Sequence, residues 1–271
     1  MSDSTEVAVK RYPEAVEQQD RLAVEEPLEL VLRFNSNGSV KEQTAAITMR
    51  TPGADFDLAR GFLFTEGVVS KPGDVVDVSY RGDESNAVVV TLDTAVEVDL
   101  GGLERHFYTT SSCGVCGKTA IEALSAAAPF SIDQGFLLQA DELLKMPAAT
   151  AAAQSAFGQT GSTHAAALFN AVGELQYLAE DVGRHNALDK LIGHALQEGL
   201  LPLADSVIFL TGRAGFELVQ KARMAACPLV AAVGAPSSLA VDSAWEAGMT
   251  LVGFLRDGRF NVYSCPNRIE A

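Results

Sequence analysis

The second half of the chain alternates between amphipathic stretches and short apolar runs, and this alternation limits the possible folds more than any other feature. From Arg184 onward, helical patterns occupy three segments, which are residues 186–198, 216–226 and 239–248. Apolar runs typical of buried strands come after each of them, at residues 205–212, 228–233 and 249–255. Such alternation of helix and strand predicts a parallel or mixed sheet that is covered by helices.

The first hundred residues have a different pattern, which is rich in strands. Residues 28–34 and 43–50 flank Asn37-Gly38, a hairpin signal because both turn residues tolerate positive φ. A short helix is expected within residues 51–67, and valine-rich strands are expected at residues 75–80, 86–92 and 95–100. We therefore predict an α/β fold, α+β overall, in which a β-rich region (1–108) precedes an α/β domain with a mixed sheet (109–271).

Three further elements are expected between these two patterns. Residues 118–128 have a good helical composition, and a helix is expected from Asp141 to about Phe157. Pro147 lies inside this second helix and predicts either a kink or two separate helices. A hairpin is expected at residues 165–181.

The charge balance excludes several kinds of partner. The chain has 35 acidic and 20 basic residues and a formal net charge of −15, which argues against nonspecific binding to nucleic acid or to anionic membranes. No stretch approaches the ~20 apolar residues of a membrane span. The N-terminus has no apolar core of a secretory signal, and four cysteines are too few for a disulfide scaffold, so we expect a cytoplasmic protein.

Two cysteines in the segment SSCGVCGK (111–118) are the first candidate reactive groups. A helix beginning just after Cys113 and Cys116 would direct N–H groups toward the sulfurs, and Lys118 would add positive charge. Both influences favour the thiolate, which is the nucleophilic form. A CxxC pair before a helix is also typical of thiol–disulfide exchange, so the pair alone does not separate dithiol exchange from persulfide carriage.

Zinc binding by these cysteines is not expected. A structural zinc site needs four ligands, but Cys227 and Cys265 are isolated and no second CxxC occurs. A zinc deaminase would also require an HxE motif, which the chain lacks. The sequence therefore predicts no metal site, and Cys227 and Cys265 have no expected role.

Several polar clusters are candidates for binding an anionic ligand. They contain His164 in TGSTHAAALF, Arg184 and His185 in EDVGRHNALDK, Arg213 in TGRAGFELVQKA, and Arg256 and Arg259 in the hairpin predicted at residues 250–264. Strand ends and helix starts that carry arginine suit anionic groups, although neither the P-loop spacing nor GxGxxG is present. Each cluster also has an ordinary structural explanation: a packed histidine, a capped polar turn, or a solvated helix or hairpin.

Taken in order, these segments resemble the FdhD family, the formate dehydrogenase accessory sulfurtransferases. The resemblance covers most of the chain from residue 50 onward and leaves the first 25 residues uncovered. It rests on RTPGADFDLARGFLFTEG (50–67), SSCGVCGK (111–118), TGSTHAAAL (160–168), EDVGRHNALDK (180–190) and the run over residues 211–264. One departure is Ser162, where the family more often has a second glycine.

The resemblance implies a specific activity. The protein is expected to be a sulfurtransferase that accepts sulfur from a cysteine desulfurase as a cysteine persulfide. It would pass that sulfur to the molybdenum bis(molybdopterin guanine dinucleotide) cofactor of formate dehydrogenase, and GDP would mimic part of this cofactor. The resemblance also implies an α/β part similar to cytidine deaminases, without their zinc ligands. The rival hypotheses are a thiol–disulfide oxidoreductase and a chaperone that only holds the molybdenum cofactor.

The resemblance also assigns residues. The persulfide carrier falls on Cys113, and Cys116 either accepts sulfur in turn or assists its reductive release. The cofactor segment falls on Phe254, Leu255, Arg256, Asp257, Gly258 and Arg259. His164, Arg184, His185 and Arg213 complete the expected cofactor-binding set. Cysteine desulfurase and formate dehydrogenase are the expected partners, and the sequence leaves a homodimer open.

Overall fold

The computed structural model describes residues 3–36, 38–82, 84–98 and 128–271. The helices are α1 (Asp55–Thr65), α4 (Ala140–Ala153), α5 (Ser155–Thr160), α6 (Arg184–Gln197), α7 (Phe216–Met224) and α8 (Ser238–Ala247). The N-terminal strands are β1 (Ser4–Arg11), β2 (Val16–Ala23), β3 (Glu26–Ser36), β4 (Ser39–Arg50), β5 (Val75–Arg81) and β6 (Glu84–Leu92). The C-terminal sheet contains β8 (His164–Asn170), β9 (Leu175–Asp181), β10 (Ser206–Leu210), β11 (Leu229–Ala232), β12 (Thr250–Arg256) and β13 (Arg259–Ser264). A short parallel pair, β7 (Leu138–Gln139) with β14 (Ile269–Glu270), joins the two ends of this region.

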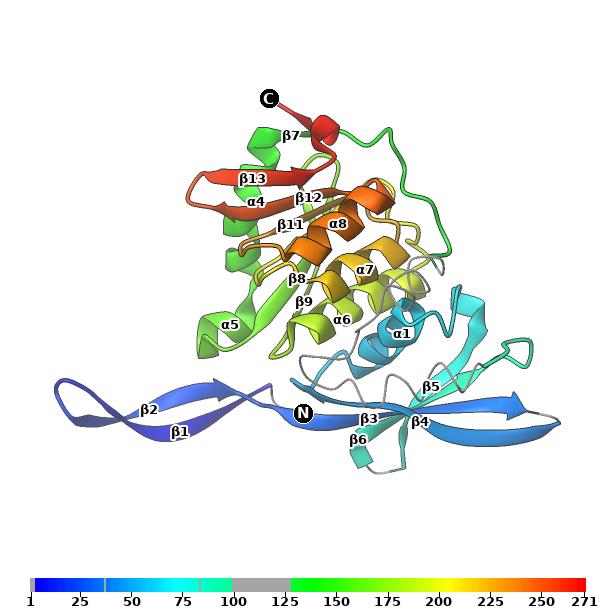
Figure 1. Cartoon of the computed structure of the whole chain (residues 1–271). Helices are drawn as coiled ribbons and strands as arrows, with labels where there is room; N and C mark the ends of the chain where they lie inside the picture. Colours follow the sequence, from blue (N-terminus) through cyan, green and yellow to red (C-terminus); the bar gives the residue numbers. More distant parts are fainter. Residues whose placement is uncertain (1–2, 37, 83, 99–127) are drawn as a thin grey trace.

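The six-stranded sheet is mixed, which confirms the predicted α/β class. Its strand order is β13-β12-β11-β10-β8-β9, in which β10, β11 and β12 are parallel and the other pairs are antiparallel. Helices α6, α7 and α8 cover one face, and α4 lies across the other (Figure 1). The expected helices and strands after Arg184 are all present.

Both faces of this sheet are buried at its centre, so the inner strands β8, β10 and β11 are apolar without alternating with polar residues. Successive side chains of β8 and β10 point to opposite faces. Ala166, Leu168 and Ile208 join the core beneath α6 and α7. Phe169 and Phe209 join a second core, which packs against α4.

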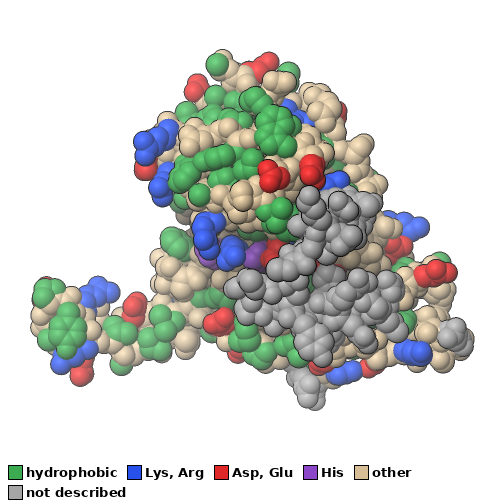
Figure 2. Space-filling model, in the orientation of Figure 1, with side chains coloured by type: hydrophobic (Ala, Val, Ile, Leu, Met, Phe, Trp, Pro, Cys, Tyr) green, Lys and Arg blue, Asp and Glu red, His purple; other side chains and the backbone are tan. Residues whose placement is uncertain are grey.

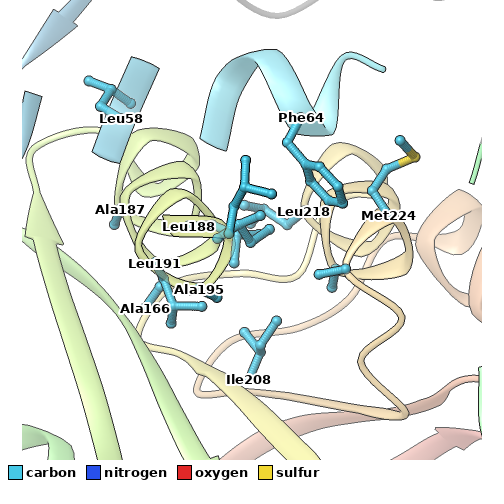
Figure 3. Close-up of a cluster of buried hydrophobic side chains, with 14 of the residues drawn as sticks. Leu58, Phe64, Ala166, Ala187, Leu188, Leu191, Ala195, Ile208, Leu218 and Met224 are labelled. Atoms are coloured by element: carbon cyan, nitrogen blue, oxygen red, sulfur yellow. The ribbon is translucent and has the colours of Figure 1, made fainter. Parts of the chain in front are cut away.

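The N-terminal strands form a separate four-stranded sheet of order β4-β3-β6-β5, on which α1 lies. Helix α1 also packs on α6, and its apolar residues enter the same core as the central sheet. Figure 3 shows Leu58 and Phe64 of α1 together with Leu188, Leu218 and Ile208 of the C-terminal region. The predicted boundary between the two regions, at residues 108–109, lies outside the described residues.

Helices α1 and α6 cross at two glycines. A Cβ atom on Gly61 would overlap the carbonyl oxygen of Asp189, and one on Gly193 would overlap the carbonyl oxygen of Asp57. Only glycine permits this backbone approach. The crossing fixes α6, whose first residues reach the candidate site.

Several expectations about elements need correction. No strand forms at residues 95–98, because Asp93 turns the chain by accepting bonds from the Ala95 and Val96 N–H groups. The helix from residue 141 is indeed two helices, but it divides at Gln154 and continues through Pro147. The hairpin β1–β2, which extends away from the body in Figure 1, was not expected.

Two further findings concern the whole chain. The expected helix at residues 118–128 falls almost entirely outside the described part of the chain. Among the helices that the structure does describe, none has the length and apolar character needed to cross a membrane.

Candidate functional site

The carboxyl ends of β10, β11 and β12 meet at one edge of the central sheet, where ligands bind in α/β proteins. The loops that leave these strands are held together by backbone hydrogen bonds. The N–H of Gly234 donates to the oxygen of Gly212 at 2.9 Å, and the N–H of Phe254 donates to the oxygen of Gly234 at 3.2 Å. The expected site segments 211–213 and 254–259 are therefore connected through Gly234.

Glycine at two of these positions lets side chains from other strands approach. A Cβ on Gly234 would lie 2.9 Å from Cγ of Arg213, which is tighter than ordinary packing allows. A Cβ on Gly212 would lie 3.4 Å from Nδ1 of His164 and 3.7 Å from Cδ of Arg184. The structure thus brings His164 and Arg184 together at Gly212, while Arg213 lies against the neighbouring Gly234.

Three helices begin at this edge. The first N–H groups of each helix have no acceptor within the helix. Helices α6, α7 and α8 start after Gly183, Gly215 and Ser237 respectively. Helix N-termini carry partial positive charge and favour anions. On the face shown in Figure 2, basic side chains lie beside histidine in the recess between the C-terminal layers and the N-terminal sheet.

The motif EDVGRHNALDK, however, is mostly structural. Asp181 and Lys190 form a buried ion pair at 2.7 Å, and Lys190 also donates to the carbonyl oxygen of Thr51. The side-chain amide of Asn186 donates to the carbonyl oxygen of Met49. These groups join α6 to the end of β4.

Within the same motif, the basic side chains of Arg184 and His185 remain partly exposed where α6 begins at the sheet edge. His185 Nε2 lies 3.0 Å from Oε2 of Glu217, which is in the first turn of α7. This hydrogen bond lowers the pKa of Glu217 below its ordinary value. Sequence reasoning missed Glu217, since a glutamate in a first helical turn is usually a solvated helix residue.

His164 is half-buried at the start of β8, and its environment favours the neutral imidazole. Burial lowers its pKa most, and the positive charges of Arg184 and His185 lower it further. The ring borders a cavity of about 260 Å³, which Gln154, Phe157, Ser162, Thr163 and Thr211 also line.

The segment 254–259 forms the end of β12, a turn and the start of β13, which confirms the predicted hairpin. Asp257 and Gly258 adopt positive φ in the turn. Phe254, Arg256, Arg259 and Asn261 line a second cavity of about 290 Å³. Leu255 is instead 1% exposed and packs in the core beneath α4.

The two cysteines without an expected role differ in exposure, since Cys227 is buried and Cys265 is partly exposed. Cys227 is fully buried, and its thiol donates to the carbonyl oxygen of Leu229 at 3.2 Å. Burial raises the pKa of this thiol to about 12. Cys113 and Cys116 lie outside the described residues, so their roles stay predictions.

The chain is similar in sequence to a known family and to several named proteins. A family model described as the FdhD/NarQ family matches residues 23–270. A protein of Streptomyces avermitilis named sulfur carrier protein FdhD is 51% identical, over 92% of this chain and 89% of its own length. Proteins with the same name from Mycobacterium tuberculosis and Sulfurisphaera tokodaii are 46% and 42% identical, over 92% and 96% of each chain.

A solved structure has the same architecture. It is the crystal structure of a protein from Desulfotalea psychrophila that has been provisionally described as a formate dehydrogenase accessory protein. The TM-score is 0.74 at 25% sequence identity, and 98% of each chain is covered. The similarity in fold therefore extends over both the N-terminal sheet and the central sheet.

Proposed function

The chain belongs to the FdhD/NarQ family, which confirms the resemblance seen in its motifs, and from this membership we propose that it is a sulfur carrier for formate dehydrogenase. The observation that carries the proposal is the similarity to proteins named sulfur carriers, 51% identical in one case, over nearly the full chain. Within that span the segment SSCGVCGK supplies the pair of cysteines that sulfur carriage requires.

The proposed first step is persulfide formation on Cys113. Its thiolate attacks the terminal sulfur of a persulfide on a cysteine desulfurase, and the donor's S–S bond breaks as the new S–S bond forms. The donor cysteine leaves as a thiolate, so no external oxidant or reductant is needed. A nearby positive charge favours the reactive thiolate, and Lys118 follows the cysteine pair in the sequence.

The second step delivers the sulfur to the molybdenum bis(molybdopterin guanine dinucleotide) cofactor, which is the substrate. Two routes balance. In the first, the outer sulfur of the Cys113 persulfide passes directly to the cofactor's molybdenum, which supplies two electrons in its reduced state, and Cys113 leaves as a thiolate. In the second, the Cys116 thiolate attacks the Cys113 sulfur. The second route releases sulfide and leaves a Cys113–Cys116 disulfide, which supplies the two electrons. The arginines and helix N-termini at the sheet edge support binding of the cofactor's phosphates despite the net charge of −15.

Mass spectrometry tests the sulfur-carrier proposal. After incubation with a cysteine desulfurase and cysteine, the protein should gain about 32 Da per sulfur atom bound as persulfide. Cys113→Ala should abolish sulfur transfer, while the matched control Cys265→Ala, which removes a partly exposed thiol elsewhere, should not. Absence of a persulfide on both Cys113 and Cys116 would refute sulfur carriage. Active formate dehydrogenase in cells that contain the Cys113→Ala/Cys116→Ala variant would favour the chaperone hypothesis.

Calorimetry with GDP tests the proposed cofactor segment separately. Arg256 and Arg259 line one cavity with Phe254, so Arg256→Ala and Arg259→Ala should each weaken GDP binding by about tenfold. Arg33→Ala, an arginine on the N-terminal sheet that pairs with Glu42, is the control and should leave binding unchanged. Equal affinity in all three variants would place the nucleotide elsewhere.

A further inference from the structure

Glu217 places an acidic side chain at the sheet edge, where an anionic substrate is expected to bind. It belongs to the first turn of α7, while Arg184 and His185 begin α6. A carboxylate in a first helical turn is favourable on its own, because it interacts with the partial positive charge of the helix N-terminus. The contact of Glu217 with a second helix goes beyond this general role.

The contact joins α7 to α6 through one pair of atoms. Nε2 of His185 lies 3.0 Å from Oε2 of Glu217, so a proton lies between them. The hydrogen bond from His185 is the largest cause of the lowered pKa of Glu217, and the charges of His185, Lys221 and Arg184 lower it further. Glu217 is therefore a carboxylate anion at neutral pH, and the proton belongs to the histidine.

This pair is easy to separate. The side chains of Glu217 and His185 are 63% and 32% exposed. Ion pairs that contact water contribute little to stability, because solvent can take the place of either partner. Asp181 and Lys190 in the motif EDVGRHNALDK differ in this respect, since their side chains are 0% and 3% exposed. An incoming ligand can therefore displace Glu217 from its partner, but not Asp181.

The position of the Glu217 carboxylate also suits a ligand anion. It lies where the first turns of α6 and α7 are close to each other, beside His185 and within the influence of Arg184. Helix N-termini and arginine both favour a negative group. Glu217 thus supplies the kind of charge that the substrate's phosphates would supply at the same edge.

We propose that Glu217 is a built-in competitor of the anionic substrate for His185. Binding requires Glu217 to leave His185, which lowers the apparent affinity by the fraction of time that the pair is formed. When the substrate leaves, Glu217 returns to His185, and this exchange suits a carrier, which must release what it binds. The proposal deepens the proposed function and rests on it, because that function supplies the phosphate-bearing substrate.

Calorimetry with inorganic pyrophosphate tests the competition on the full-length protein. Glu217→Gln keeps the size of the side chain and removes its charge, so it should bind pyrophosphate about fivefold more tightly than the wild type. Glu198→Gln removes the same charge at the far end of α6, about 20 Å away, and should leave the affinity unchanged. If Glu217→Gln binds no more tightly than the wild type, including no binding at all, the proposal is overturned. An equal gain from Glu198→Gln overturns it too.

A double-mutant cycle shows whether Glu217 acts through His185. His185→Ala should weaken pyrophosphate binding, because it removes a hydrogen-bond donor from the sheet edge. Adding Glu217→Gln to His185→Ala should then change the affinity by less than about twofold, since nothing remains to compete for. A gain that persists in full in the double variant would mean that Glu217 only repels anions at a distance, which overturns the proposal. The pair is exposed, so the variants should keep the urea denaturation midpoint of the wild type.

Sulfur uptake on the same preparations separates this proposal from the proposed function. If Glu217→Gln gives no gain while Cys113 still accepts sulfur from the desulfurase, only the proposed competition fails. If Cys113 accepts no sulfur in the wild-type protein, the sulfur-carrier proposal fails, and calorimetry still decides whether Glu217 competes with an anion for His185.

Discussion

Residues of the same type have different roles in this chain, and burial separates them. In EDVGRHNALDK, Asp181 and Lys190 neutralise each other in the core, while Arg184 and His185 reach the sheet edge. Charged groups buried in pairs hold elements together, whereas partly exposed ones can still exchange a partner for a ligand. The polar content of a motif therefore does not show which of its residues bind a ligand.

His164 should titrate below its ordinary pKa of 6.5, because burial and the positive charges of Arg184 and His185 disfavour the imidazolium. Its pKa is depressed on folding, so the unfolded chain binds the proton more readily. The stability that neutral His164 contributes is present above about pH 6.5 and is lost as pH falls through the folded pKa. NMR titration should show the low midpoint, and Arg184→Gln should raise it. A wild-type midpoint at or above 6.5 would contradict this assignment.

Cys227 should be inert toward thiol reagents in the native protein. Its pKa of about 12 leaves almost no thiolate at neutral pH, and the sulfur is fully buried. Iodoacetamide followed by peptide mapping should label Cys227 only after denaturant is added, whereas partly exposed Cys265 should react earlier. Labelling of both at one rate would show that the core opens around Cys227.

At the scale of elements, the crossing of α1 and α6 decides where the helix that carries Arg184 begins. The crossing depends on two glycines, Gly61 and Gly193, at the contact between the helix backbones. Helices normally pack 8–10 Å apart with side chains between them. Without side chains at the crossing, α1 approaches closely enough to bury Leu58 and Phe64 against α6 and α7.

Gly61→Ala should strongly destabilise the protein. The added methyl group overlaps the carbonyl oxygen of Asp189, so the helices must separate, and we expect a loss of about 3 kcal/mol in the free energy of unfolding. Gly158→Ala in α5 is the matched control, since its Cβ would meet nothing within 4 Å and alanine favours the helix. Urea denaturation of both variants tests this prediction. Similar midpoints for Gly61→Ala and Gly158→Ala would show that the crossing tolerates a side chain.

At the scale of the whole molecule, the N-terminal and C-terminal regions share one core and a buried ionic cluster. Lys221 of α7 lies 3.0 Å from Asp189 of α6 and 3.4 Å from Glu66, and it donates to the Thr65 hydroxyl at 2.8 Å. Burial alone disfavours charge on Lys221, but the two carboxylates outweigh it and raise its pKa. The cluster joins the end of α1 to two helices of the central sheet.

Lys221→Met should lower the free energy of unfolding by about 3 kcal/mol or more, because Asp189 is left buried without its cation. Burial then raises the pKa of the Asp189 carboxyl further, so the loss should be smaller at acid pH and grow as pH rises through that pKa. Lys145→Met removes an exposed pair with Glu142 and should change stability by less than about 1 kcal/mol. Equal losses in chemical denaturation at neutral pH would argue against a role for the cluster.

The sequence alone was sufficient to predict most helices and strands, because these elements depend on the local periodicity of apolar residues. The helices and strands after Arg184, the hairpin at residues 250–264 and the Gly38 turn all follow from patterns within a few residues. One failure has a local cause and another has a distant one. Asp93 turns the chain where valines predicted a strand, and a helix breaks at Gln154, where distant Glu180 supplies the hydrogen bonds that restart it.

The site required the tertiary structure. Its residues come from β8, α6, the loops after β10 and β11, and β12, and no local pattern shows that Gly212 lies against His164 and Arg184. Glu217 became a candidate only when α7 was placed beside His185. The periodicity of apolar residues reflects the local secondary structure of a segment. Close approach between segments depends on how the sheet and its helices pack, which the chain determines only as a whole.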